Sequence, residues 1–197
     1  MHESRITQHA SHAHSFKKEK GILMSTSAIG RPSATEHAPY YEKYVSLVPE
    51  GDIISTLGRQ AETTLSLLGS IPEAQANNRY APDKWSIKEL VGHVVDSERI
   101  FAYRALRFAR NDPARLPGFE QDDYVANAAF GETPLTDLAA EFDCVRRATV
   151  YMLKSLTADA WLRSGDANGS LVTVRALAHI IAGHELHHVG ILRARYL

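Results

Sequence analysis

Cysteine is nearly absent from this sequence, since Cys144 is the only one among 197 residues. A single thiol excludes an intramolecular disulfide framework and any zinc or iron–sulfur site built from thiolates alone. A surplus of basic charge is missing too, because 22 Lys and Arg stand against 23 Asp and Glu. Non-specific nucleic-acid binding requires such a surplus, so we expect no nucleic-acid partner. Cys144 lies off the apolar stripe of its helix, and we expect it to be a small packing residue.

Long apolar runs are also missing. No stretch has the length of a signal peptide or of a membrane span, so we expect a soluble, cytoplasmic protein without a membrane partner. Residues 1–40 are polar and rich in Ser, with no periodic apolar face, and we predict that they form a disordered leader. Residues 41–197 are long enough for one domain with a core of its own.

Four segments of this domain have helical periodicity. Ser86 opens one of them with a capping box to Glu89, and Thr133-Pro134 opens another with a cap followed by proline. No segment alternates as a strand does. Because each helix has one apolar stripe, the sequence predicts an all-α four-helix bundle. The four helices are expected at about residues 52–68, 86–110, 133–156 and 173–197.

The link between the second and third helices, residues 111–132, is longer than a compact bundle needs. Long ordered links often act as lids or binding loops. A crossover that spans an end of the bundle would explain the same length. The sequence leaves both interpretations open.

Histidine is the residue type in unusual supply, with ten copies. At about 100° per residue, His184 and His188 fall on the stripe where a bundle needs aliphatic side chains, and His93 does the same on the second helix. A lone inward-facing histidine is usually a hydrogen-bonded core residue. Three of them, two at i,i+4 spacing, favour a divalent metal site, because buried imidazoles without partners carry a desolvation cost.

Several polar residues near these histidines are weaker candidates for a supporting role. Asp96, Ser97 and His187 could orient a ligand or an imidazole, and Glu185 could also accept a proton. His179 lies on another face and should be solvated, and the histidines at positions 2, 9, 12, 14 and 37 have no expected role.

Three residues farther from the cluster are candidates for the surroundings of the site. Arg104 shares the stripe of His93, but it should pair with Asp122 or Asp123 of the link rather than touch a metal. Tyr103 and Tyr124 could form walls of a cavity.

The fourth helix also matches a known metalloenzyme motif. His184-Glu185-Leu186-His187-His188 satisfies H-E-x-x-H, in which the glutamate of a zinc peptidase is the general base. Only nine residues follow His188, which leaves little room for a third ligand downstream. No sheet is predicted whose edge could hold a peptide. We therefore do not expect peptidase activity.

Residues 41–197 resemble the DinB-like (DinB/YfiT) superfamily. The stretches that carry the resemblance are KWSIKELVGHVVDSERIFAYRALRFAR on the second helix, LPGFEQDDYV in the link and GHELHHVGILRARY on the fourth helix. The resemblance implies a helical bundle with a divalent metal held by one histidine of the second helix and a His-x3-His pair of the fourth. The matching positions are His93, His184 and His188. It also implies a homodimer.

The resemblance leaves a choice of activities, because the superfamily contains thiol-dependent S-transferases, a thiol-dependent maleylpyruvate isomerase and metal-dependent hydrolases. A divalent metal lowers the pKa of a coordinated thiol in the first case and activates water in the second. We expect an enzyme that transfers a low-molecular-weight thiol to an electrophile or hydrolyses a small substrate. The alternative is a metal-binding stress or interaction bundle without turnover. Zn²⁺ suits three imidazoles best, and Ni²⁺, Fe²⁺ and Mn²⁺ stay open.

Overall fold

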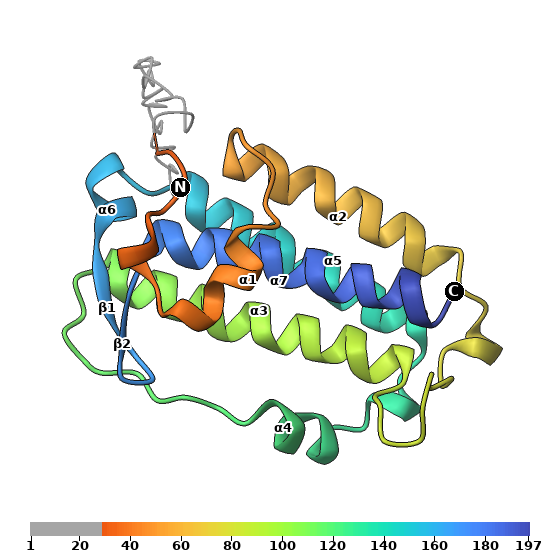
Figure 1. Cartoon of the computed structure of the whole chain (residues 1–197). Helices are drawn as coiled ribbons and strands as arrows, with labels where there is room; N and C mark the ends of the chain where they lie inside the picture. The colour runs from red at the N-terminus through yellow and green to blue at the C-terminus, as the bar shows by residue number, and fades with distance from the viewer. Residues whose placement is uncertain (1–28) are drawn as a thin grey trace, which may run out of the picture.

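The computed structural model describes residues 29–197, and four long helices dominate it (Figure 1). The predicted four-helix bundle is confirmed. In the described part of the chain, no helix has the length and apolar character needed to cross a membrane. The long helices are α2 (Ile53–Gly69), α3 (Ile87–Ala109), α5 (Leu135–Lys154) and α7 (Val174–Arg195).

Short elements connect and cover these helices. Most of them lie in the segments that lead into the bundle or join two of its helices. They are η2 (Ala34–Glu36), η3 (Pro39–Tyr41), α1 (Glu42–Val45), η4 (Glu73–Gln75), α4 (Gln121–Asn127), η5 (Phe130–Glu132), α6 (Ala158–Leu162), β1 (Ser164–Ala167) and β2 (Ser170–Thr173).

The helices begin where side chains can cap their free N–H groups. At the start of α3, Ser86 accepts a hydrogen bond from the backbone N–H of Glu89, whose carboxylate accepts one from the Ser86 N–H at 2.6 Å. The predicted capping box is therefore present. At the start of α5, Pro134 is the cap rather than the first helical residue, and the Leu135 N–H donates to the carboxylate of Glu73 at 2.9 Å.

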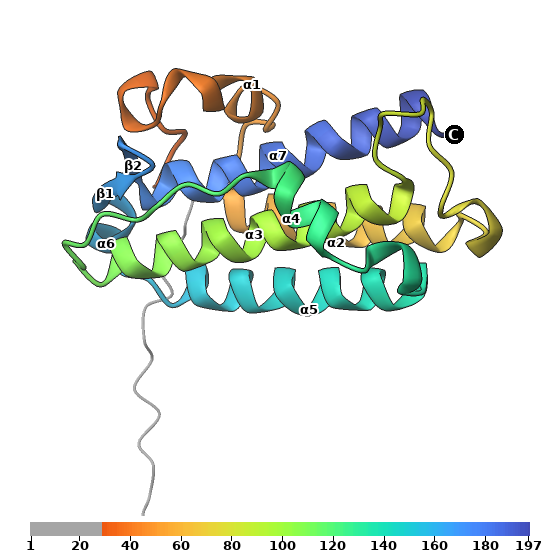
Figure 2. The ribbon, with the colours of Figure 1, turned by 90° about the horizontal axis from the view of Figure 1, so that it is seen from below.

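The order of packing in the bundle explains the long link. Both α3 and α2 pack against α5 and α7, and α3 runs parallel to α5 but opposite to α7 (Figure 1). Because α3 ends at the far end of the bundle from the start of α5, the chain must return over roughly the 34 Å length of a 23-residue helix. Figure 2 shows the link with α4 running along α3 and α7. The crossover interpretation is correct, but the link spans the length of the bundle and not its end.

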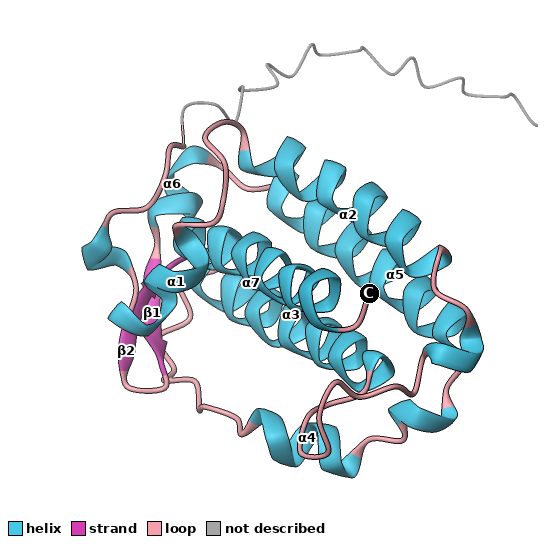
Figure 3. Ribbon diagram, turned by 45° about the vertical axis from the view of Figure 1, so that its right-hand side comes forward, coloured by secondary structure: helices cyan, strands magenta, loops and turns pink. Residues whose placement is uncertain are grey.

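The expectation that the chain has no strands is wrong, because β1 and β2 form an antiparallel hairpin at one end of the bundle (Figure 3). Asn168 and Gly169 make its two-residue turn with φ of 54° and 74°. Asn-Gly favours this turn because both residues tolerate positive φ. The link is tied to the hairpin, since the Leu116 N–H donates to the Asp166 carbonyl at 2.9 Å.

The predicted leader is wrong for residues 29–40, which pack on the bundle through η2 and η3. Glu36 pairs with Arg175 of α7 at 2.5 Å, and Arg31 donates to the Val45 carbonyl at 2.7 Å. These contacts join residues far apart in sequence, so composition alone could not reveal them. The remainder of the predicted leader, residues 1–28, lies outside the described residues.

One charged cluster lies inside the bundle, and we call Arg146, Glu98 and Glu185 the Arg146 cluster. Arg146 of α5 is 1% exposed and donates to the carboxylate of Glu98 on α3 at 2.8 Å. It also donates to Glu185 of α7 at 2.7 Å and to the Leu57 carbonyl of α2 at 3.1 Å. One side chain therefore joins all four long helices and holds α3 and α7 in register.

Candidate metal centre

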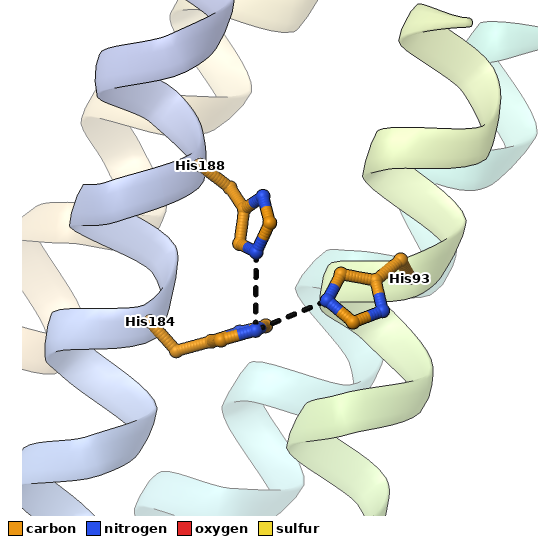
Figure 4. A group of neighbouring side chains, drawn as sticks. All are labelled: His93, His184 and His188. Atoms are coloured by element: carbon orange, nitrogen blue, oxygen red, sulfur yellow. Dashed lines mark hydrogen bonds between the residues drawn. The ribbon is translucent and has the colours of Figure 1, made fainter. Parts of the chain in front are cut away.

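Three imidazoles meet between α3 and α7 (Figure 4). His184 Nε2 lies 3.1 Å from His93 Nε2 and 3.2 Å from His188 Nε2. Nitrogen ligands about 2.0–2.1 Å from a tetrahedral Zn²⁺ are about 3.3 Å apart. The two spacings from His184 suit such an ion, and one nitrogen from each of the three rings lies within 4.8 Å of the others. In the described part of the chain, no other group of three or more histidine, cysteine or acidic residues could hold a metal ion.

Burial keeps the three rings in the form that binds metal. His93, His184 and His188 are 3%, 5% and 8% exposed. Burial lowers the pKa of His93 to about 4 and, together with the neighbouring histidines, that of His188 to about 3. Burial and the same neighbours hold the pKa of His184 well below its usual value. All three are thus neutral at pH 7, with a nitrogen lone pair free for a cation.

Aromatic side chains surround the cluster. The ring of Trp85 lies 4.6 Å from that of His93, measured between centroids. Tyr44 and Phe101 meet the ring of His184 edge-on at 5.2 and 5.8 Å. These contacts restrict the rotation of the imidazoles and enclose the cluster in aromatic surface.

A glycine precedes the first histidine of the cluster on each of the two helices. A Cβ atom at Gly183 would lie 2.0 Å from the carbonyl oxygen of Tyr44, and one at Gly92 would lie 2.4 Å from the ring of Phe130. The absence of a side chain lets α1 and η5 lie directly against α7 and α3. The close approach of α1 and η5 beside the cluster therefore depends on glycine at these two positions.

The cluster opens on one side to a cavity of about 480 Å³, whose surface includes His93 and His184. The other walls come from η3 and α1, from link residues 118–122 and from the β1–β2 turn. The link therefore forms part of the cavity wall, and its role as a binding loop stays a prediction.

Tyrosines of the N-terminal segment form a wall of this cavity that sequence reasoning missed. They are Tyr40, Tyr41 and Tyr44. Their close spacing in PYYEKY, next to the start of the predicted domain, was the signal that could have drawn attention to them. Periodicity could not show that this segment folds back over α7.

The four predicted supporting residues have different surroundings. Ser97 Oγ lies 3.5 Å from His93 Nδ1 and lines the cavity. Asp96 pairs with an arginine of its own helix at 3.5 Å, and His187 packs edge-on against a tyrosine of α1 at 5.3 Å. Of these three, only Ser97 is placed to orient a ring of the cluster through a hydrogen bond.

Glu185, the fourth predicted supporting residue, has a structural role. Its Oε2 accepts from Arg146 at 2.7 Å and its Oε1 accepts from the Thr64 hydroxyl at 2.6 Å. The residue is 2% exposed and does not line the cavity. The glutamate of the H-E-x-x-H match is therefore held by Arg146 and Thr64 and is not free to act as a general base.

Three predictions about the surroundings of the site are wrong. Arg104 forms no ion pair with Asp122 or Asp123; it lines the cavity and donates to a carbonyl of the link at 2.7 Å. Tyr103 and Tyr124 are 50% and 48% exposed and lie outside the cavity wall. The reason is that the link presents a backbone carbonyl, rather than a carboxylate, to the guanidinium of Arg104, and that both tyrosines are turned to solvent.

Three further side chains differ from expectation in burial. His179 is 4% exposed rather than solvated, because the N-terminal segment covers its face of α7, and its Nδ1–H donates to the Arg175 carbonyl at 2.9 Å. His37, expected in the leader, is buried as well. Cys144 is exposed on α5 rather than packed.

Comparison with known proteins agrees with this geometry. No curated protein matches the chain. Among solved structures it is similar to YfiT from Bacillus subtilis, with a TM-score of 0.64 and 14% identity, over 85% of this chain and 95% of that one. That protein is described as "a probable metal-dependent hydrolase with an unusual four-helix bundle topology". The family model of the DinB superfamily matches residues 56–192, which is more than half of the chain, and the chain therefore belongs to the DinB superfamily.

Proposed function

We propose that this protein is a metal-dependent enzyme that acts on a small molecule, with hydrolysis as the leading reaction. The observation that carries the proposal is the convergence of three buried Nε2 atoms at a point that faces a cavity of about 480 Å³. This volume is typical of small-molecule sites. Hydrolysis is favoured because YfiT, which shares the fold, is described as a hydrolase.

The residues of the cluster would hold the ion through Nε2 of His93, His184 and His188, which keeps the ring protons on Nδ1. Ser97 can then accept the Nδ1 proton of His93 in a hydrogen bond. A divalent ion in such a site polarises a substrate oxygen and lowers the pKa of water. Trp85 packs against His93 and does not line the cavity, whereas Tyr44 and Phe101 do, so reactants reach the cluster from the cavity along an aromatic surface.

Proton transfer needs a group other than Glu185. Among the described residues that line the cavity, the only carboxylates are Glu120 and Asp122, both in the link. We propose that one of them moves the proton, and we expect Glu120→Gln or Asp122→Asn to slow turnover while the metal content is unchanged. If neither variant is slower, the link takes no part in the chemistry.

Metal analysis tests the proposal first. Protein purified without chelator, or reconstituted with Zn²⁺, Mn²⁺ or Ni²⁺, should hold close to one ion per chain. His93→Ala should lose the ion, and His187→Ala, next to the cluster, should keep it. The loaded protein should then hydrolyse a member of a panel of small chromogenic esters, amides and phosphoesters. Failure to retain any of these metals would refute the proposal.

Transfer of a small thiol is the second candidate. It is favoured by the absence of cysteine from the described cavity wall and by the exposed position of Cys144 on α5, so any thiol must arrive as a co-substrate. With Co²⁺ in the site, a bound thiol should change the visible spectrum, and an electrophile such as monochlorobimane should be consumed. If the thiol changes no spectrum, the electrophile is not consumed and no substrate is hydrolysed, the bundle binds metal without turnover.

A further inference from the structure

Arg104 of α3 is a buried cation whose charge has no partner. Its side chain is on the cavity surface, and the residue is only 3% exposed. The guanidinium donates to the Pro117 carbonyl at 2.7 Å, but within the described residues no carboxylate lies at ion-pair distance. Arg146, the other arginine buried to this degree, has two carboxylates. A buried charge without an opposite charge is costly, so its retention calls for a ligand.

Arg104 lines the cavity, and its hydrogen bond to the Pro117 carbonyl uses only one of its nitrogens. The Cζ atom lies 5.9 Å from the centre of the Phe101 ring, which supports one face of the guanidinium. Tyr41 lines the same cavity beside it, and the positive charge of Arg104 opposes the increase that burial causes in the pKa of Tyr41. An arginine and a tyrosine hydroxyl next to each other offer several donors and no negative charge.

Arg104 and the histidine cluster face the same cavity. The Phe101 ring is close to both, 5.9 Å from the Cζ of Arg104 and 5.8 Å from the His184 ring. The guanidinium carbon is therefore no more than 11.7 Å, the sum of these distances, from the centre of that ring. A molecule of a few carbon atoms can bridge this span.

We propose that Arg104 binds the anionic group, a carboxylate or a phosphate, of a small substrate whose reacting group lies at the histidine cluster. The place of the reacting group rests on the proposed function, whereas the anion site depends only on Arg104 and its neighbours. The planar fork of arginine matches two oxygens of either anion, which a lysine could not do. An uncharged molecule as long as the anionic substrate would leave Arg104 buried without a partner, so the site selects against such molecules.

The anion site is tested without reference to the metal. Protein as purified, and protein after metal removal, is titrated calorimetrically with glutarate, inorganic phosphate and uncharged glutaramide. Glutarate or phosphate should bind both forms, the tighter of the two identifying the anion, and glutaramide should not. Arg104→Gln should weaken anion binding about tenfold or more, and Arg104→Lys should weaken it less. Arg99→Gln, on the exposed side of the same helix, is the matched control and should have no effect.

Substitution of a buried residue could unfold the bundle, so one measurement uses the unaltered protein. The Nε–H resonance of Arg104 should shift during titration with the anion, while that of Arg99 stays in place. Equal binding of glutarate and glutaramide, an anion affinity unchanged in folded Arg104→Gln, or an Arg104 resonance that does not move would overturn the proposal.

A second probe links the two ends of the cavity. The monohydroxamate of adipic acid carries a metal-binding group and a carboxylate, and its methyl ester lacks only the charge. On the metal-loaded protein the acid should bind about tenfold or more tightly than the ester, and Arg104→Gln should remove this difference without weakening the ester. If the ester does not bind and the acid binds metal-loaded and metal-free protein equally, the proposed function has failed and the anion site stands. If both bind equally, the anion site has failed and the metal centre stands.

Discussion

Replacing Arg146 with methionine tests how the bundle holds its histidines together. Methionine keeps an unbranched apolar stem but removes the cation, together with five hydrogen bonds between 2.7 and 3.1 Å. The side chains of Glu98 and Glu185, each 2% exposed, are left without an opposite charge. Removing one partner from a buried ion pair costs about 3–5 kcal/mol.

This loss should be plain in thermal unfolding. For a chain of this length, a loss of about 1 kcal/mol in unfolding free energy lowers Tm by about 2–4 °C. We therefore expect Tm at pH 7, measured by circular dichroism, to fall by about 6–20 °C. Burial raises the pKa of Glu185, and in the variant Arg146 no longer opposes that increase. A raised carboxyl pKa means that the folded state binds more protons than the unfolded state. The stability deficit should therefore shrink as the pH falls from 7 to 4.

Two controls separate this explanation from general damage to α5. Arg147→Met removes the neighbouring arginine, whose side chain is 68% exposed, and should change stability by less than about 0.5 kcal/mol. Adding Glu98→Gln and Glu185→Gln to Arg146→Met removes the stranded charges and should recover much of the loss. A fall in Tm of less than about 2 °C, or no recovery in the triple variant, would refute the reasoning.

Other predictions concern the metal, the covering segment and the N-terminal ion pair. His188→Ala should weaken Zn²⁺ binding by more than about 100-fold in a competition assay, whereas His187→Ala should leave it nearly unchanged. Gly183→Ala should lower the free energy of unfolding in urea by about 1–3 kcal/mol, because its Cβ atom would meet backbone 2.0 Å away. Gly190→Ala, on the same helix with open space around it, should raise that energy by up to about 1 kcal/mol. The guanidinium of Arg175 lowers the pKa of Glu36 to about 2, so the stability that Glu36 provides is present above its unfolded pKa, near 4.5, and disappears as the pH falls toward 2. Glu36→Gln should cost about 1.5–3 kcal/mol in urea unfolding at pH 7 and much less at pH 3.

Each of these has an outcome that contradicts it. Equal Zn²⁺ affinity in the two histidine variants would mean that the ion is held elsewhere. If Gly183→Ala and Gly190→Ala were equally stable, α1 would not be in contact with α7. A deficit for Glu36→Gln that is the same at pH 7 and pH 3 would show that its charge does not contribute.

The helices that carry the site could be predicted because their signals are local. The capping box at Ser86 and the apolar periodicity around His93 lie within one segment of α3. On α7 the spacing of His184 and His188 was sufficient to put both rings on one face. The burial of His179 was not predicted, because α7 is buried on nearly all of its faces and has no single apolar stripe.

The walls of the site and the Arg146 cluster beside it could not be predicted, since both depend on contacts between distant segments. The members of the Arg146 cluster lie on three different helices, and nothing local identifies Glu185 as a partner of Arg146 rather than a base at a metal. The β1–β2 hairpin did have a local signal, Asn168-Gly169, but its strands are only four residues long and show little alternation.

The dipeptide Gly-His occurs at 92–93 and again at 183–184, and it offers a way to recognise related sites in other sequences. His-x3-His alone also selects peptidase helices, whereas a glycine before each of the two histidines indicates helices that other segments cover closely. A chain with the three histidines but a larger residue at position 183 has no room for α1 in this place. Such a chain would keep the metal ligands and lose the tyrosine wall, and its substrates should differ from those of the protein described here.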